Sequence, residues 1–125
     1  MINIQKRAKS AVGIAEKLFQ IKLDYSDDSI KNVELILDKT YDKRDDRNME
    51  IVNGFTLIFG CYITKTIERN HRGIIVQNTI KDVPNIKIGE TTCFPLYWCY
   101  KRLTLGEEDN VWHKYLFLKS DAFNK

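Results

Sequence analysis

Apolar side chains are densest between residues 48 and 71, in the stretch NMEIVNGFTLIFGCYITKTIERNH. From Ile51 to Ile63 only Asn53 and Thr56 are polar, so most of this segment must lie inside the molecule. Helical steps of three and four place five apolar residues on one side, and three more widen that surface over most of the circumference. The five are Val52, Phe55, Phe59, Tyr62 and Ile63, and the three are Ile51, Leu57 and Ile58. The pattern predicts a central buried helix.

The same residues also fit two strands around Asn53-Gly54, because Asn-Gly between apolar runs is a strong hairpin signal. Each glycine inside a helix costs roughly 0.8–1 kcal/mol relative to alanine, which favours the strands. We prefer the helix because the first strand would be very short and because the run ITKTIERN continues with helical spacing. In a helix, Gly54 and Gly60 are predicted to be points of close backbone approach, and Gly73 is predicted to end it.

Two amphipathic helices are predicted before the central one. Residues 2–22 form the first, with a buried face of Ile4, Ala8, Ala11, Ala15 and Leu18. A basic amphipathic helix can bind a membrane surface or a calmodulin-like partner, but its alanines favour docking on the protein's own core. The second helix follows Ser26 as N-cap, with Asp27 and Asp28 in its first turn. Its buried stripe is Ile30, Val33, Leu37 and Tyr41, and residues 42–48 are a solvated connector.

After residue 72 the pattern changes to short β-branched runs. Residues 73–81 and 86–88 predict a hairpin, and residues 91–94 could extend it to a three-stranded meander with a turn at Gly89. Pro95 suits the first turn of a helix that ends before Gly106. A last helix would begin at residues 107–109, with Trp112, Tyr115, Leu116 and Leu118 turned inward, although 111–118 fits a strand equally well. The predicted fold class is α+β, as a single domain.

Composition is that of a soluble globular domain: 125 residues, 43% hydrophobic and 30% charged. No apolar leader follows MINIQKRAK, and the longest apolar run, about 13 residues, is shorter than the roughly 20 that span a membrane. Three cysteines form an odd count, which is typical of reduced thiols in the cytoplasm. The many lysines, isoleucines and asparagines suggest an AT-rich bacterial genome. These features predict a cytoplasmic protein that does not insert into membranes.

The charges are divided along the chain. Residues 1–22 carry five basic side chains and one acid, whereas residues 23–50 carry nine acids and five bases. We expect these two segments to pack against each other, which leaves mainly Arg69, Arg72, Lys101 and Arg102 to act outward. A surface built for nucleic acid is usually more one-sided, so tight binding to DNA or RNA is not expected.

Four short motifs resemble a group of small uncharacterised bacterial proteins, over about residues 20–118. They are an Asp-aromatic-Ser element at a helix start, a Gly-x-Tyr element in a central helix, an Arg-Asn-Gly corner before a hairpin, and a Phe-Pro with a later Lys-Arg. Here they are Asp24, Tyr25 and Ser26; Gly60 and Tyr62; Arg69, Asn70 and Gly73; and Phe94, Pro95, Lys101 and Arg102. Thr64-Lys65 replaces the group's usual Gly-Glu pair, and Ile75 its tryptophan. The resemblance implies an α+β fold with a helical centre, and it implies no activity.

No motif for catalysis, metal or cofactor binding stands out. Cys93 and Cys99 lack the spacing of metal ligands, and no glycine-rich phosphate loop occurs. A Cys–His nucleophile is formally available from these cysteines with His71 or His113, but the neighbouring aromatics indicate packing. Asp27 and Asp28 could pair as catalytic carboxylates, although acids at a helix start are common for other reasons.

Two groups remain as candidate interaction residues. Tyr97, Tyr100, Lys101 and Arg102, with Trp98, mix aromatic and basic side chains, a combination that can bind single-stranded nucleic acid. On a helix they divide between two sides, so part of the set belongs to the core. Glu68, Arg69, Asn70 and His71 form a polar helix end that could hold a ligand or anchor the hairpin.

The absence of a catalytic set favours a non-enzymatic cytoplasmic protein that acts by protein–protein contact, of an immunity or regulatory type. The alternative is a nucleic-acid-associated protein that uses residues 97–102. A third class is an enzyme whose site has no recognisable motif. No cofactor and no metal are expected.

Overall fold

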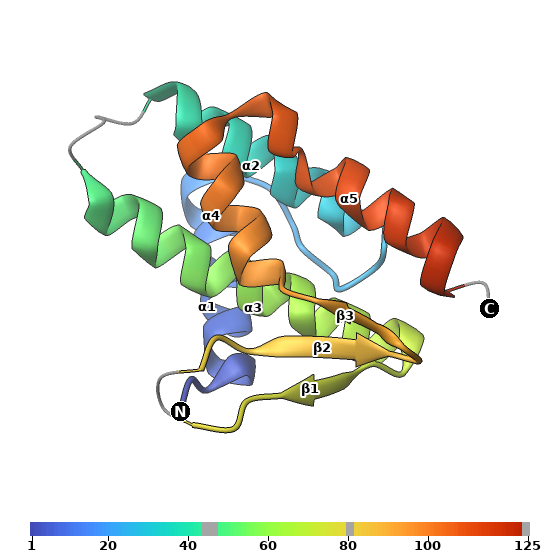
Figure 1. Ribbon diagram of the computed structural model, residues 1–125. Helices are drawn as coiled ribbons and strands as arrows, with labels where there is room; N and C mark the ends of the chain where they lie inside the picture. The colour runs from blue at the N-terminus through green and yellow to red at the C-terminus, as the bar shows by residue number, and fades with distance from the viewer. Residues whose placement is uncertain (44–47, 80–81, 124–125) are drawn as a thin grey trace.

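The computed structural model describes residues 1–43, 48–79 and 82–123 and has an α+β fold (Figure 1). Its helices surround a long central helix, and a small antiparallel sheet lies along one edge. The elements are α1 (Ile4–Phe19), α2 (Ser29–Lys43), α3 (Met49–His71), β1 (Ile74–Val76), β2 (Asn85–Ile88), β3 (Thr91–Cys93), α4 (Pro95–Leu105), η1 (Glu107–Asp109), α5 (Val111–Leu118) and η2 (Lys119–Phe123). The predicted fold class is confirmed. The connector predicted at 42–48 lies largely outside the described residues.

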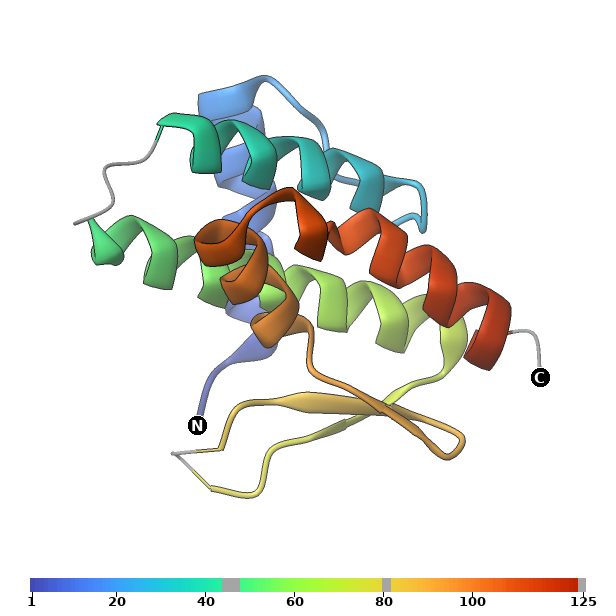
Figure 2. The same ribbon diagram turned by 45° about the horizontal axis from the view of Figure 1, so that its top comes forward.

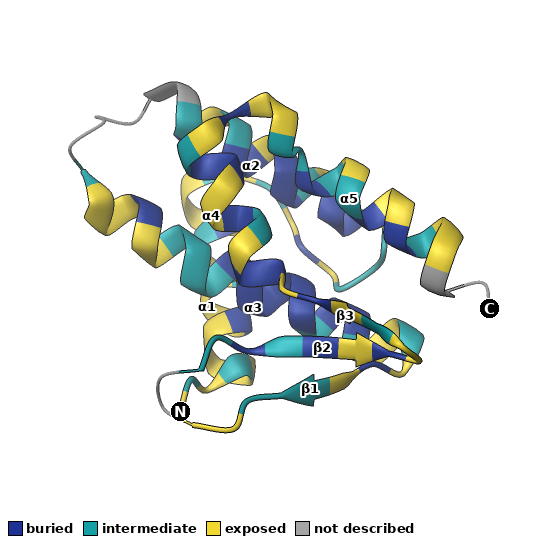
Figure 3. Cartoon of the chain, viewed as in Figure 1, coloured by how far each residue is buried: buried dark blue, intermediate teal, exposed yellow. Residues whose placement is uncertain are grey.

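The central stretch is one helix, α3, so the preference for a helix over two strands was correct. α1 crosses behind it and α4 crosses in front of it, as Figures 1 and 2 both show. Nearly every residue of α3 from Phe59 to Ile67 is buried. The first turns are less covered, and Ile51, predicted to be part of the apolar surface, is exposed. Figure 3 shows this change from exposed to buried along the helix.

The two glycines of α3 differ in their surroundings. A Cβ atom on Gly60 would lie 2.7 Å from the Cα atom of Leu96, so α4 can approach α3 only because residue 60 has no side chain. The prediction for Gly60 is therefore confirmed. A Cβ atom on Gly54 would meet nothing within 4 Å, so the prediction of a close approach at Gly54 was wrong.

The first helix packs on α3 through small residues. Ala8, Ala11 and Ala15 are fully buried, and their short side chains let the two backbones come close. Leu18, predicted for the same face, is exposed. It lies in the last turn of α1, which ends at Phe19 and is followed by Gln20 in a left-handed conformation (φ 54°). The stripe of α2 is as predicted: Ile30, Val33 and Leu37 are buried, and Tyr41 is partly buried.

The strands form a meander in the order β1-β2-β3, with Ile75 opposite Ile86 and Lys87 opposite Thr92. The turn between β2 and β3 contains Gly89 in a left-handed conformation (φ 59°), as predicted. Gly73 has another role than ending α3, because Arg72 takes the left-handed position there (φ 56°). A Cβ atom on Gly73 would lie 2.5 Å from the side chain of Ile86, so this glycine lets the sheet pack on α3.

The last third of the chain is helical. α4 begins at Pro95 and is followed by Gly106 (φ 100°), both as predicted. Residues 111–118 are the helix α5, which settles the open choice between helix and strand. Asn110 starts α5 by accepting a hydrogen bond from the backbone N–H of His113 at 3.0 Å. Tyr115 and Leu118 are buried, whereas Leu116, predicted to face inward, is exposed.

The expected packing of the basic N-terminus against the acids of α2 was wrong. α1 packs along α3, while α2 packs on α4 and α5 (Figure 2). Within the described ranges no ion pair joins residues 1–22 to residues 23–50. The lysines of α1 therefore remain at the surface. No helix in the described parts of the chain has the length and apolar content to cross a bilayer.

Candidate functional site

The densest group of polar contacts lies where the loop between α1 and α2 meets the C-terminal half of α3. Tyr25 in this loop has a left-handed backbone (φ 63°), which is uncommon for a residue with a side chain. Two side chains from α3 hold it there. The Tyr62 hydroxyl accepts a hydrogen bond from the Tyr25 N–H at 2.8 Å, and Asn70 Nδ2 donates to the Tyr25 carbonyl at 2.8 Å. Both polar groups of the strained backbone are thus satisfied.

Short-range contacts prepare this loop conformation. The carboxylate of Asp24 accepts hydrogen bonds from the backbone N–H and the hydroxyl of Ser26, at 3.0 and 2.6 Å. The Ser26 hydroxyl accepts in turn from the N–H of Ser29 at 3.1 Å, which is the capping bond expected of Ser26. α2 itself begins at Ser29, later than predicted, and the Ser29 hydroxyl lies 2.7 Å from that of Tyr62.

The Tyr25 ring contacts two side chains from α3. Its centroid is 4.8 Å from that of Tyr62, and the guanidinium carbon of Arg69 is 4.5 Å from it. A guanidinium stacked on an aromatic ring keeps its N–H edge available for a planar anion. Burial raises the pKa of the Tyr25 hydroxyl, while the positive charges of Arg69 and Lys65 act in the opposite direction.

Asp27 is the centre of a second network, which joins the start of α2 to α3 and α5. Its carboxylate accepts from the Tyr115 hydroxyl at 2.5 Å, from His71 Nε2 at 2.9 Å and from Asn70 Nδ2 at 3.2 Å. Lys119 Nζ lies 3.7 Å away. Burial alone would raise the pKa of Asp27, but these donors hold it below its ordinary value.

This network has the properties of a structural tie. A general base needs a free lone pair directed at a substrate and a pKa near the working pH. The carboxylate of Asp27 is occupied by several donors, and its lowered pKa makes it a weaker base. The geometry therefore does not favour proton-transfer catalysis by Asp27 with His71 and Tyr115.

Arg102 lies in a third network, inside the protein. Its Nε donates to both carboxylate oxygens of Glu34, at 2.9 and 3.0 Å, and its Nη2 donates to Asp38 at 2.5 Å. Glu34 also accepts from the backbone N–H of Val111 at 3.0 Å. The side chain of Arg102 is fully buried. Glu34 and Asp38, two of the acids expected to face the basic residues of α1, pair with this arginine instead. The expectation that Arg102 acts outward was wrong.

The other residues singled out from the sequence fall into two places. Tyr97, Tyr100 and Lys101 are exposed on α4, and Trp98 is partly buried. Glu68 pairs with Lys65 at 2.6 Å, Arg69 stacks on Tyr25, and Asn70 and His71 bind the Asp27 network. α4 begins beside the middle of α3, whereas this second group lies at the C-terminal end of α3 (Figure 1).

Sequence reasoning missed the tertiary contacts of Tyr25, Tyr62 and Tyr115. Tyr62 and Tyr115 were assigned to the core on spacing alone, and spacing does not reveal a hydroxyl that bonds to a residue tens of positions away. Asp27 was interpreted as an acid in the first turn of α2, where the positive end of the helix dipole favours a carboxylate. The available signal was an aromatic residue between two cap-forming side chains, Asp24-Tyr25-Ser26.

The thiols offer no activated nucleophile. Cys61, Cys93 and Cys99 are free and buried. Burial raises the pKa of Cys61 to about 12 and that of Cys93 to about 11, and it also raises the pKa of Cys99. A thiol must ionise to attack, so these groups are unreactive near neutral pH. Among the described residues, no three His, Cys, Asp or Glu side chains gather as metal ligands would.

Comparison of the chain with protein-family models, with curated proteins and with solved structures finds no match.

Proposed function

We propose that this protein is a non-enzymatic cytoplasmic protein that acts by contact with another protein, through the outer face of α4. The observation that carries the proposal is the exposure of large apolar side chains along this one face. Phe94, Tyr97, Tyr100 and Leu105 are 40%, 48%, 40% and 65% exposed. The alternation of exposed and buried residues along α4 is visible in Figure 3.

These side chains are arranged for contact with a folded surface. Phe94 and Tyr97 touch, with ring centroids 5.9 Å apart, so they present a joined apolar area. Tyrosine is enriched at protein interfaces because it offers a large rigid contact area with a polar tip. The segment from residue 94 to 105 has no acidic residue, and Lys101 is its exposed charge. A partner surface with an acidic group beside an apolar pocket would complement it.

Nucleic acid is less well supported as the partner. Arg102, one of the two basic residues among residues 97–102, is buried and paired with Glu34. Lys101 is therefore the exposed cation of this segment. Affinity for nucleic acid depends on several phosphate contacts. We expect no binding tighter than about 10⁻⁵ M to mixed-sequence oligonucleotides at physiological salt.

A photo-crosslinking amino acid at position 97 or 100, in the protein expressed in its own cells, tests the proposal. Position 117 is the matched control, because Phe117 is an exposed aromatic residue on α5. One protein crosslinked from 97 and 100, absent from 117 and lost with Lys101→Glu, would support the proposal. The same products from all three positions would contradict it. Submicromolar oligonucleotide binding that is lost with Lys101→Ala would favour nucleic acid instead.

A further inference from the structure

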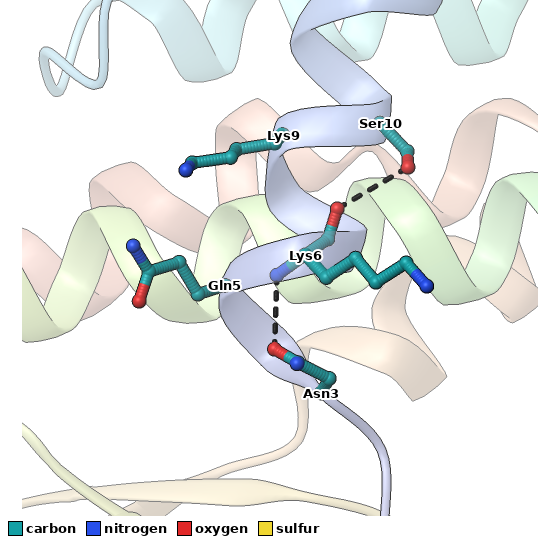
Figure 4. A pocket seen from close by; sticks show the side chains of 5 residues that line it. All are labelled: Asn3, Gln5, Lys6, Lys9 and Ser10. Carbon is teal, nitrogen blue, oxygen red and sulfur yellow. Dashed lines mark hydrogen bonds between the residues drawn. The ribbon is translucent and has the colours of Figure 1, made fainter.

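A small pocket of about 230 Å³ lies between α1, the loop that holds Tyr25, and α3. Its α1 wall is one face of the helix, because Gln5, Lys9 and Val12 follow each other at steps of four and three. Figure 4 shows Gln5 and Lys9 pointing to the same side of α1, one turn apart, while Lys6 points to the other side. Lys65 and Arg69, also one turn apart, form the α3 wall.

The lining of this pocket is positive. Lys9, Lys65 and Arg69 contribute three cations, and no carboxylate lines it. Lys65 is paired with Glu68 at 2.6 Å, whereas in the described part of the chain Lys9 and Arg69 have no ion-pair partner. Like charges gathered around a concave surface repel one another and concentrate anions.

The part of the pocket lined by Tyr25 and Arg69 is preorganised. Tyr25 is fixed in its strained conformation by the side chains of Tyr62 and Asn70, and its ring supports the guanidinium of Arg69. Strained backbone that is held by its surroundings is concentrated at ligand sites. The support of Arg69 restricts its rotamers before any ligand arrives, which lowers the entropy lost on binding. The cation with the best geometry for a phosphate is thus the one that is held in place.

We propose that this pocket binds a small phosphate monoester. The N–H edge of Arg69 would take two phosphate oxygens, and Lys9 and Lys65 would neutralise the remaining charge. Val12 and the Tyr25 ring supply apolar area for the organic part, and Gln5 a hydrogen-bonding group. The volume is below the roughly 300–1,000 Å³ of drug-sized sites, so the organic part is small. This proposal does not depend on the function proposed for α4.

Isothermal titration calorimetry with phenyl phosphate, at constant ionic strength set with chloride, tests the proposal. We expect saturable binding with one site per chain, weakened at least tenfold by Arg69→Gln and by Lys9→Gln. Arg72→Gln is the matched control: it removes the same charge from the next exposed arginine along the chain, outside the pocket lining, and should change the affinity less than twofold. Circular dichroism of each variant checks that the fold is retained.

Two further titrations, with inorganic phosphate and with lipid vesicles, show which kind of phosphate compound the pocket binds. Inorganic phosphate should compete with phenyl phosphate but bind more weakly, since it lacks the organic part. Vesicles with phosphatidic acid carry the same phosphate monoester on a lipid. Binding to these vesicles with no binding of phenyl phosphate would overturn the assignment to a small molecule. The absence of saturable binding by both phenyl phosphate and the vesicles, or equal weakening of binding by Arg69→Gln and Arg72→Gln, would overturn the site itself.

Discussion

The contact between Gly60 and Leu96 allows a sharp test of how α4 packs on α3. Gly60→Ala adds one methyl group, whose carbon would lie 2.6 Å from Leu96 Cγ and 2.7 Å from Leu96 Cα. A flexible side chain could turn away, but the Cα atom moves only if α4 moves. Gly54→Ala makes the same chemical change on the same helix, at a position where nothing lies within 4 Å.

The changes in the free energy of unfolding that the two variants cause should differ in sign, or at least clearly in size. Replacing glycine by alanine inside an exposed helix stabilises the fold by roughly 0.8–1 kcal/mol, and this is the expected gain for Gly54→Ala. Gly60→Ala has the same gain in helix propensity, opposed by about 1–3 kcal/mol of overpacking. The propensity contribution cancels in the comparison, so the free energies of unfolding should differ by about 1–3 kcal/mol.

Urea denaturation followed by circular dichroism measures this difference, and thermal unfolding provides a second estimate. For a chain of this length, about 1 kcal/mol corresponds to roughly 4 °C in Tm. We expect Gly54→Ala to melt above the wild type and Gly60→Ala to melt at or below it. If both variants were equally stabilised, α4 would not pack closely at residue 60, and the packing described for the core would be refuted.

Three further results are expected. Arg102→Met should lower the free energy of unfolding by roughly 3–5 kcal/mol, because it leaves the buried Glu34 without its charged partner. Lys101→Met, at the exposed neighbouring position, should change it by less than about 0.5 kcal/mol. An equally small loss for Arg102→Met in urea denaturation would place Arg102 at the surface. The pKa of Asp27 is lower in the folded than in the unfolded chain, so its carboxylate stabilises the fold above about pH 4 and this contribution is lost as the pH falls through the folded-state pKa. Asp27→Asn should therefore flatten the fall in stability on acidification, compared with Asp28→Asn at an exposed position, and an unchanged acid limb would show that Asp27 is not held by its donors. The three cysteines should react slowly with a thiol reagent at neutral pH and all titrate after denaturation; rapid labelling of the native protein would contradict their burial.

The sequence predicted those features that depend on local interactions. Pro95, Gly106 and Gly89 act through the allowed conformations of one or two residues, and their roles were correct. The spacing of apolar residues also identified α3, because a long apolar segment with helical periodicity has few alternatives. The fold class follows from these elements.

The errors share a physical cause. Periodicity indicates which residues share a face, but it does not indicate how far the neighbouring element extends. Leu18 and Ile51 are therefore exposed although their spacing places them on apolar faces. Arg102 was expected to be exposed because burial of a charge requires partners, and Glu34 is 68 residues away in the chain. The contacts of Tyr25 were missed because its partners, Tyr62 and Asn70, are also far away in the chain.

The network around Asp27 has a consequence for the order in which the protein can fold during synthesis. Asp27 and Tyr115 are 88 residues apart, and Glu34 and Val111 are 77 residues apart. At about 5–20 residues per second, a ribosome needs roughly 4–18 s to make the residues that separate Asp27 from Tyr115. Until α5 has been made, Asp27 lacks the hydroxyl of Tyr115 and Glu34 lacks the backbone N–H of Val111. α1 and α3 can pair early, and the loop around Tyr25 can settle once α3 has been made, because Tyr62 and Asn70 hold it. α2 can settle only when α4 and α5, on which it packs, have emerged.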